Sequence, residues 1–167
     1  MRGGRPRDHS QVQVHLIRHA DALSRKGFDQ PDEYRPLSDR GRDQARGLAD
    51  RRWSSVVDVL SSPAIRCATT VAPLAARNGL TVESRPELAE GADPALALNM
   101  IEEGDFAGDI VVCSHGDLIP EMLHLFELRG CTLVGPSMVD KASTWTVEFQ
   151  GGVAETATYV APPVLPD

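Results

Sequence analysis

The chain has 167 residues, 41% of them hydrophobic, and a formal net charge of -7 at pH 7. A chain of this length forms one domain of ordinary size and can bury a core without disulfides or a structural metal. The acidic balance argues against a nucleic acid polymer as a general partner, because phosphate backbones would be repelled, and no apolar run is long enough to predict a membrane span.

Strand and helix patterns alternate along the chain. Residues 1–11 are rich in Arg, Gly and polar side chains and are expected to form a flexible arm rather than a signal peptide. Strands are predicted near 12–18, 56–61, 81–84 and 109–114, and helices near 39–52, 63–78, 94–103 and 117–128. Residues 144–149 and 154–160 predict a hairpin, and the proline-rich residues 161–167 predict an extended surface tail. This order predicts an α/β three-layer sandwich over residues 12–160, with a mostly parallel central sheet, helices on both faces and an antiparallel C-terminal edge.

The first predicted strand ends at Arg18 and His19, where it runs out into a loop. Open α/β sheets place their chemistry at the carboxyl ends of their strands. The permanent cation of Arg18 opposes protonation of the neighbouring imidazole, and a neutral imidazole is able to attack phosphorus. Arg18 and His19 are therefore candidate catalytic residues.

A second candidate follows the strand predicted at 56–61. Ser62 is a suitable N-cap and Pro63 suits the first helical position, which places Arg66 in the first turn of a helix. Free N–H groups and the positive end of the helix dipole attract anions there, and an arginine adds a bidentate fork. An arginine on a solvated helix face would have the same local sequence, so Arg66 alone does not identify an anion site.

The strand predicted at 109–114 ends in Ser114, His115 and Gly116, with Asp117 as the predicted N-cap of the next helix. Gly116 permits a sharp turn or a close approach to a ligand, so Ser114 and Gly116 are candidate substrate-binding residues beside His115. Because parallel strands end at one edge of a sheet, the three strand ends are expected to bring an Arg-His pair, an arginine and a second histidine together.

These segments resemble the motifs of the histidine phosphatase superfamily, which is phosphoglycerate mutase-like in fold. The superfamily pattern is Arg-His-Gly after the first strand, Ser-Ser-Pro-x-x-Arg opening a helix, and Ser-His after a later strand. The matching residues are Arg18, His19, Ser61 to Pro63, Arg66, Ser114 and His115. Residues 35–45 are similar to the superfamily's Pro-Leu-Thr/Ser-x-x-Gly-x-x-Gln-Ala helix start, and the short chain resembles the SixA-type phosphohistidine phosphatases. Ala20 stands where the superfamily has Gly, which requires a negative φ at this position.

The resemblance implies a phosphotransfer reaction in which His19 attacks phosphorus and the resulting phosphohistidine is hydrolysed. Arg18, Arg66 and His115 would neutralise the oxygens of the phosphoryl group, and this positioning and electrostatic work is most of what phosphoryl transfer requires of a protein. No metal ion or other cofactor is expected.

The proton donor for the leaving group has three candidates. Larger members of the superfamily place a Glu in the loop after the third strand, and Glu90 has the corresponding position here. Asp21, which is also a candidate substrate-binding residue, is the second choice and Asp117 the third. SixA-type enzymes resemble a reduced version in which a dedicated acid is missing, because an imidazole is easier to expel than an alkoxide.

Two polar loops, 24–35 and 129–143, are expected to border the site. The segment from Lys141 to Trp145 resembles a Lys-Gly-Ser-Thr-Trp segment of histidine phosphatase domains fused to Nudix hydrolases, which makes Lys141 and Ser143 candidate substrate contacts. A short chain implies an open cleft, which suits a phosphorylated protein carrying phosphohistidine. Nucleotides or other small phosphomonoesters are the alternative substrates.

Other reaction chemistries require different sequence motifs. A cysteine phosphatase needs Cys-x₅-Arg, but the residues six positions after the cysteines are Pro73, Ile119 and Ser137. A metallohydrolase built on His15, His19 and Asp21 and a non-catalytic phosphate-binding module are the remaining alternatives. The cysteines, Cys67, Cys113 and Cys131, form no paired metal or redox spacing and are expected to be reduced thiols in a cytoplasmic protein. Cys67 and Cys113 are expected to be buried packing residues.

Overall fold

The computed structural model describes residues 11–53 and 55–167, so all but the last residue of the arm predicted over 1–11 lies outside the described part of the chain. A single sheet has the strand order β3-β2-β4-β1-β6-β7-β5. The strands are β1 (Gln11–Arg18), β2 (Val56–Ser61), β3 (Val82–Ser84), β4 (Asp109–Ser114), β5 (Thr132–Val134), β6 (Thr144–Gln150) and β7 (Val153–Val160). The helices are α1 (Asp39–Ala49), α2 (Ile65–Arg77), α3 (Pro94–Glu103) and α4 (Leu118–Leu128), with short 3-10 turns η1 (Asp32–Tyr34) and η2 (Pro86–Leu88).

The sheet is parallel except at one strand. β3, β2, β4 and β1 pair in parallel, β6 is antiparallel to both β1 and β7, and β5 is parallel to β7. β6 therefore runs against every other strand that the structure describes. The predicted hairpin is present as β6 and β7, but the three-residue β5, which the sequence did not predict, lies outside it as the last strand.

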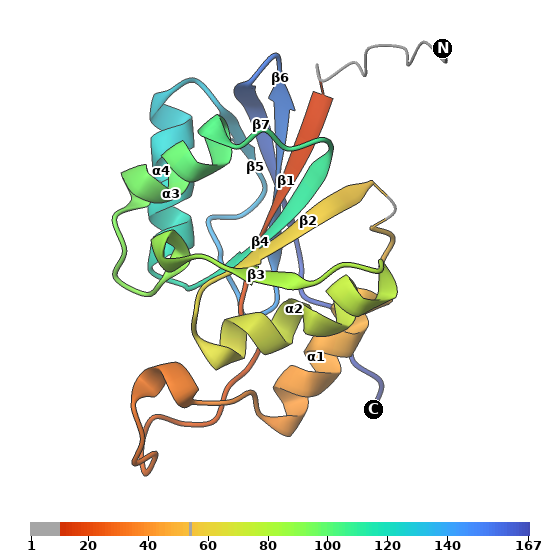
Figure 1. The fold of residues 1–167 in the computed structure, drawn as a ribbon, viewed down its shortest axis with the longest axis vertical. Helices are drawn as coiled ribbons and strands as arrows, with labels where there is room; N and C mark the ends of the chain where they lie inside the picture. The colour runs from red at the N-terminus through yellow and green to blue at the C-terminus, as the bar shows by residue number, and fades with distance from the viewer. Residues whose placement is uncertain (1–10, 54) are drawn as a thin grey trace, which may run out of the picture.

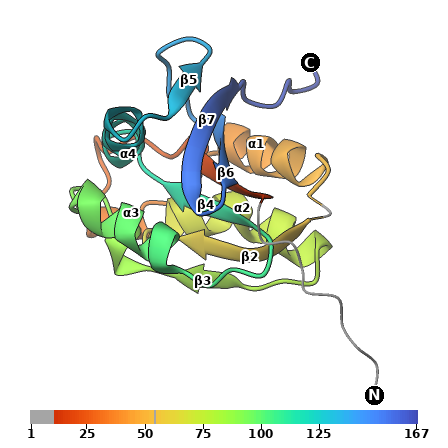
Figure 2. The same ribbon diagram turned by 90° about the horizontal axis from the view of Figure 1, so that it is seen from above.

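Helices cover both faces of the sheet, as the α/β pattern predicted (Figures 1 and 2). Val111 and its neighbours on one face pack against α1 and α2, whereas Val112 faces α3 and α4. This alternation follows from the period of two in a strand, which sends successive side chains to opposite faces. The apolar side chains on each face of the sheet form a buried cluster with the helices that cover it. The central strands are therefore fixed between two helical layers.

The core positions the strand ends that carry the motifs. Arg18 at the end of β1 pairs with Ser114 at the end of β4, and Ser61 at the end of β2 pairs with Cys113. The three carboxyl ends thus lie side by side at one edge of the sheet. This register is what brings residues far apart in the sequence to a common place, as expected for parallel strands.

Helix α2 begins later than the sequence predicted. Its first residue is Ile65 and its N-cap is Ala64, which has no side chain able to cap. Ser62 and Pro63 precede the helix and are not its N-cap and first residue, although the Ser62 hydroxyl does accept the Ala64 N–H at 3.3 Å. Arg66 still lies in the first turn.

The tail after β7 has no regular secondary structure, in line with the extended segment predicted from its prolines. Pro163 of the tail lies close to Gly47 of α1, and the guanidinium of Arg51, just after α1, donates a hydrogen bond to the carbonyl of Ala161 at 2.6 Å. Across residues 11–53 and 55–167, the helices are all too short or too polar to cross a membrane.

Candidate active site

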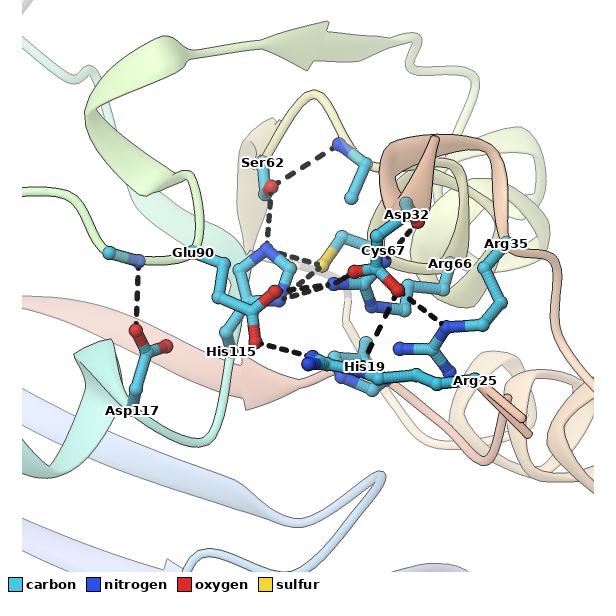
Figure 3. A network of polar contacts seen from close by, with 12 residues as sticks. His19, Arg25, Asp32, Arg35, Ser62, Arg66, Cys67, Glu90, His115 and Asp117 are labelled. Carbon is cyan, nitrogen blue, oxygen red and sulfur yellow. Dashed lines mark hydrogen bonds and ion pairs between the residues drawn. The ribbon is translucent and has the colours of Figure 1, made fainter. Parts of the chain in front are cut away.

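Two histidines and an arginine from three strand ends meet at the carboxyl edge of the sheet (Figure 3). The rings of His19 and His115 have their centroids 5.5 Å apart in an edge-to-face arrangement. The Nη2 atom of Arg66 is 3.4 Å from Nδ1 of His115. Arg66 and His115 are each 1% exposed, and His19 is 7% exposed. The predicted motif residues therefore share one buried polar cluster.

His19 is held with one ring nitrogen free. Its Nδ1 lies 2.8 Å from the carbonyl oxygen of Ala20, and because a carbonyl only accepts, Nδ1 carries the proton and Nε2 the lone pair. Burial is the largest cause that lowers the pKa of His19 to about 3, with smaller contributions from the charges of His115, Arg66 and Arg18 and an opposing one from the Ala20 carbonyl. The imidazole is neutral at pH 7, as predicted, but burial contributes more to this than the neighbouring cations do.

The backbone around His19 fits an alanine at position 20. Ala20 does not have a positive φ, and its N–H donates to the Thr70 hydroxyl of α2 at 2.9 Å. Ala142 does have a left-handed φ of 63°, and its N–H donates to the carbonyl of Arg18 at 3.0 Å. Ala142 stands where the similar Lys-Gly-Ser-Thr-Trp segment has glycine, the residue for which such a φ carries no penalty.

Arg18 lies beside Gly116, and the two positions depend on each other. The guanidinium donates from Nη1 to the carbonyl of Val139 at 2.7 Å, while its Nε is buried without a hydrogen-bond partner among the described residues. A Cβ at position 116 would be 2.6 Å from Cζ of Arg18. Glycine is therefore needed at this position to leave room for the guanidinium, in addition to any role at the turn.

Arg66 is enclosed by acceptors from two loops. Nη2 donates to Glu90 at 3.0 Å and forms an ion pair with Asp32 at 3.0 Å, and Nη1 donates to the backbone carbonyl of Asp32 at 2.8 Å. Arg25 joins the same network through a 2.7 Å ion pair with Glu90. The hydrogen bond from Arg35, together with the charges of Arg66 and Arg25, lowers the pKa of Asp32. The carboxylates of Asp32 and Glu90 thus neutralise the buried guanidinium in this structure.

His115 has two further polar neighbours, Ser62 and Cys67. Nε2 lies 2.8 Å from the hydroxyl of Ser62 and 3.5 Å from the thiol of Cys67. Burial opposes ionisation of Cys67, but hydrogen bonds from Cys113 and His115 and the charge of Arg66 outweigh it and lower the pKa of this thiol. Cys67 and Cys113 are both fully buried. Burial was predicted for them, but the contact between Cys67 and His115 was not.

A cavity of about 340 Å³ opens above His19. Its lining includes six residues predicted for the site, and the others come from the loop between β1 and α1. The predicted ones are Arg18, His19, Glu90, Gly116, Asp117 and Lys141, and the others are Ala22, Leu23, Ser24, Arg25 and Arg35. This volume is in the range of a small-molecule site.

Three of the predicted substrate contacts have other roles in the structure. Ser114 donates its hydroxyl to the carbonyl of Leu88 at 2.8 Å, and its own carbonyl accepts the His19 N–H at 3.0 Å. Ser143 has a buried hydroxyl and supports the end of β1 through its carbonyl. Asp21 forms a 2.9 Å ion pair with Lys141 and accepts a hydrogen bond from Ser38. Ser114, Ser143 and Asp21 therefore lie around the cavity and do not line it.

The three candidate proton donors differ in their surroundings. Glu90 accepts from the guanidinium groups of Arg25 and Arg66 and lines the cavity together with His19. Hydrogen bonds from Lys141 and Ser38 lower the pKa of Asp21, which makes that carboxyl a poor acid. Asp117 accepts the backbone N–H of Gly91 at 2.8 Å at the border of the cavity (Figure 3).

The sequence missed four polar residues around the cluster. Arg25, Asp32 and Arg35 belong to the loop between β1 and α1, which was predicted only as a border of the site, and Ser62 was interpreted as a helix cap. The Asp32-x-x-Arg35 spacing, which allows the 2.8 Å ion pair observed between them, was the one local signal available. The contacts of Asp32 and Arg25 with Arg66 and Glu90 bridge distant parts of the chain and leave no such signal.

The trio proposed as an alternative metal site is not assembled. His15 points away from the cluster, where it contacts Thr146 at 3.0 Å and packs against Trp53. Over the described ranges, no group of three His, Cys, Asp or Glu side chains has an arrangement that could hold a metal ion.

A family model described as histidine phosphatase superfamily, branch 1, matches residues 14–92, a range that contains His19, Arg66 and Glu90. The matched range is just under half of the chain, and it marks a similarity to the histidine phosphatase superfamily. The predicted resemblance to this superfamily is thereby confirmed for the motifs at His19 and Arg66, and the motif at His115 lies outside the matched range.

The chain is similar to a curated protein over nearly its whole length. An 8-oxo-(d)GTP phosphatase of Mycolicibacterium smegmatis is 29% identical over 164 residues, which is 95% of this chain and 50% of the relative. The chain thus spans about half the length of this curated relative.

Solved structures show the same fold. The protein histidine phosphatase SixA, solved as a complex with tungstate, has a TM-score of 0.68 at 24% identity, with 91% of this chain and 96% of SixA covered. A phosphoglycerate mutase of Bacillus anthracis has a TM-score of 0.63 at 17% identity, with 93% of each chain covered. At these identities the likeness concerns the fold alone, and it confirms the phosphoglycerate mutase-like architecture.

Proposed function

We propose that this chain is a phosphatase that uses His19 as its nucleophile. The observation that carries the proposal is the neutral ring of His19, whose Nδ1–H is held by the Ala20 carbonyl while Nε2 is free beside His115 and Arg66. Nε2 attacks phosphorus, the bond from phosphorus to the leaving group breaks, and its electron pair goes to the leaving oxygen or nitrogen. Water then cleaves the phosphohistidine to inorganic phosphate and regenerates His19.

The charges around His19 suit the transition state of this reaction. Arg18 and Arg66 each carry a buried Nε–H without a partner among residues 11–53 and 55–167, so donors are available for phosphoryl oxygens. Fixed donors of this kind in a buried site stabilise developing negative charge more than they would in water. We assign Arg18, Arg66 and His115 to this role, and no step of the proposed reaction passes through a metal ion or cofactor.

Glu90 is the proposed proton donor. It lines the same cavity as His19 and shares Arg66 with Asp32. A phosphoryl group bound by Arg66 would compete with Glu90 for that guanidinium and release one carboxyl oxygen toward the leaving group. Asp21 fits this role less well, because its carboxylate is held by Lys141 and Ser38.

The substrate is proposed to be a phosphorylated protein carrying phosphohistidine, in line with the fold shared with the protein histidine phosphatase SixA. One observation favours the alternative, a nucleotide or another small phosphomonoester. The cavity has cations beyond the phosphoryl-binding arginines, namely Arg25, Arg35 and Lys141, and they could bind further anionic groups of a small substrate. The 8-oxo-(d)GTP phosphatase relative, which this chain covers only in part, agrees with that alternative.

The test is hydrolysis of p-nitrophenyl phosphate by the purified chain with and without chelator and vanadate. We expect activity that ignores chelator and is blocked by vanadate. His19→Asn should abolish turnover and covalent labelling by radioactive substrate together, whereas His124→Asn, which replaces a surface histidine with a 66% exposed side chain, should change neither.

Two outcomes would refute parts of the proposal. Labelling that survives in His19→Asn would place the nucleophile elsewhere, and vanadate binding without any turnover would indicate a non-catalytic phosphate-binding module. Rates on a phosphohistidine peptide, nucleotides and sugar phosphates at equal concentration then separate the two substrate classes.

A further inference from the structure

The hydroxyl of Ser62 is the nearest polar neighbour of His115 that the structure describes. Its Oγ lies 2.8 Å from Nε2 of the ring, and it also accepts the Ala64 N–H at 3.3 Å. Both Ser62 and His115 are 1% exposed, so water does not compete for this contact. Figure 3 shows the hydroxyl on the side of the ring opposite Glu90 and Arg25.

The two ring nitrogens of His115 face different partners. Nδ1 is 3.4 Å from Nη2 of Arg66, and a guanidinium can only donate. Nδ1 therefore holds the lone pair in the neutral ring, and the proton is on Nε2, where Ser62 accepts it. A phosphoryl oxygen can only accept, so His115 must present a proton on Nδ1 when it binds one.

A serine hydroxyl is suited to both situations because it can donate or accept. With Ser62 at Nε2, the ring keeps a hydrogen bond whether Nε2 is protonated or not. The nearest other polar atom to Nε2 is the Cys67 sulfur at 3.5 Å, which bonds only weakly. Loss of the Ser62 hydroxyl would leave a buried ring nitrogen poorly satisfied and the ring free to change its orientation or its tautomer.

We propose that Ser62 is a positioning residue that acts through His115: it anchors Nε2 so that Nδ1 faces the reacting phosphoryl group with a defined proton. This inference rests on the proposed phosphatase function and adds a residue outside the group assigned to phosphoryl contact. Ser62 does not touch the substrate, so its removal should lower kcat and leave KM nearly unchanged.

The kinetic test compares four variants. Ser62→Ala should lower kcat about 10-fold to 100-fold, the loss expected when a buried hydrogen bond to a catalytic group is removed. Ser62→Cys keeps the size but bonds weakly and should resemble the alanine variant, whereas Ser62→Thr keeps the hydroxyl and should restore activity. Ser61→Ala is the matched control, because the adjacent buried hydroxyl of Ser61 donates to the Ser62 carbonyl at 2.9 Å and does not contact the ring.

A second readout does not depend on turnover. The ¹⁵N chemical shifts of the His115 ring report which nitrogen carries the proton, without and with vanadate as a phosphoryl analogue. We expect a single Nε2–H form in the free protein, a protonated Nδ1 with vanadate, and a mixture of forms in Ser62→Ala.

The inference is overturned if Ser62→Ala keeps kcat within twofold of the unsubstituted protein, if Ser61→Ala loses as much, or if the ring shifts are the same with and without the Ser62 hydroxyl. If the unsubstituted protein shows no phosphatase activity, the proposed function fails, and the ring shifts still decide whether Ser62 sets the proton on His115.

Discussion

His19→Asn should make the protein less sensitive to acid. Burial lowers the pKa of His19 to about 3, against an ordinary value of 6.5. Between these two values the unfolded chain binds a proton at this position and the folded chain does not. The contribution of His19 to the free energy of unfolding is therefore fully present above pH 6.5 and is lost as the pH falls toward 3.

The size of the effect follows from this difference in pKa. One unit corresponds to about 1.4 kcal/mol, and integration from pH 8 to pH 5 gives a loss of about 2 kcal/mol that is due to His19 alone. Other groups, such as His15, whose pKa burial also lowers, contribute equally to both proteins and cancel in the difference. Asparagine has an N–H that can replace the Nδ1–H, but it does not titrate.

Urea unfolding of both proteins at pH 8, 6.5 and 5 measures this difference. Between pH 8 and pH 5, the free energy of unfolding of the unsubstituted protein should fall by about 2 kcal/mol more than that of His19→Asn. For His124→Asn, at an exposed position, the free energy of unfolding should change with pH as it does in the unsubstituted protein. If the free energy of unfolding of His19→Asn depends on pH in the same way as that of the unsubstituted protein, the ring is not held neutral by burial. The argument for a free nucleophile would then fail.

Three further substitutions test single contacts. Gly116→Ala would place a Cβ 2.6 Å from Cζ of Arg18 and should lower kcat/KM about 10-fold to 100-fold, with the melting temperature little changed because the flexible guanidinium can move aside. Gly41→Ala would place a Cβ 1.8 Å from the backbone oxygen of Asp21, which cannot yield, and should destabilise the fold by about 1–3 kcal/mol in urea unfolding. Glu90→Gln should slow alkyl phosphates much more than p-nitrophenyl phosphate if Glu90 protonates the leaving group; equal losses on both would leave it only a role in holding Arg66.

Local patterns in the sequence were enough to predict most of the fold. The pattern of apolar and turn residues predicted the ends of each long helix and strand to within a few positions. For example, β1 covers Gln11–Arg18, and the prediction was 12–18. The short β5 was missed because three residues carry too little pattern to distinguish a strand from a loop. Its place outside the hairpin depends on pairing with β7, which is a contact between distant segments.

The start of α2 shows a role for a side chain that its local sequence did not predict. Ser62 followed by Pro63 is a good start for a helix, yet α2 begins at Ile65 and the hydroxyl of Ser62 is directed to His115. The imidazole lies on another strand end and cannot be recognised in the sequence around Ser62. The same hydroxyl still accepts the Ala64 N–H, so the contact with His115 adds to a local hydrogen bond and does not replace it.

The sequence by itself determined that an Arg-His pair, an arginine and a second histidine stand at three strand ends, because residue type and periodicity are local properties. The tertiary structure decided how these groups are neutralised and oriented. Asp32 reaches Arg66, Arg25 reaches Glu90 and Ser62 reaches His115 across 34, 65 and 53 positions of the chain. Such contacts depend on the register of the sheet and the path of the loops, and those are set by packing of the whole core.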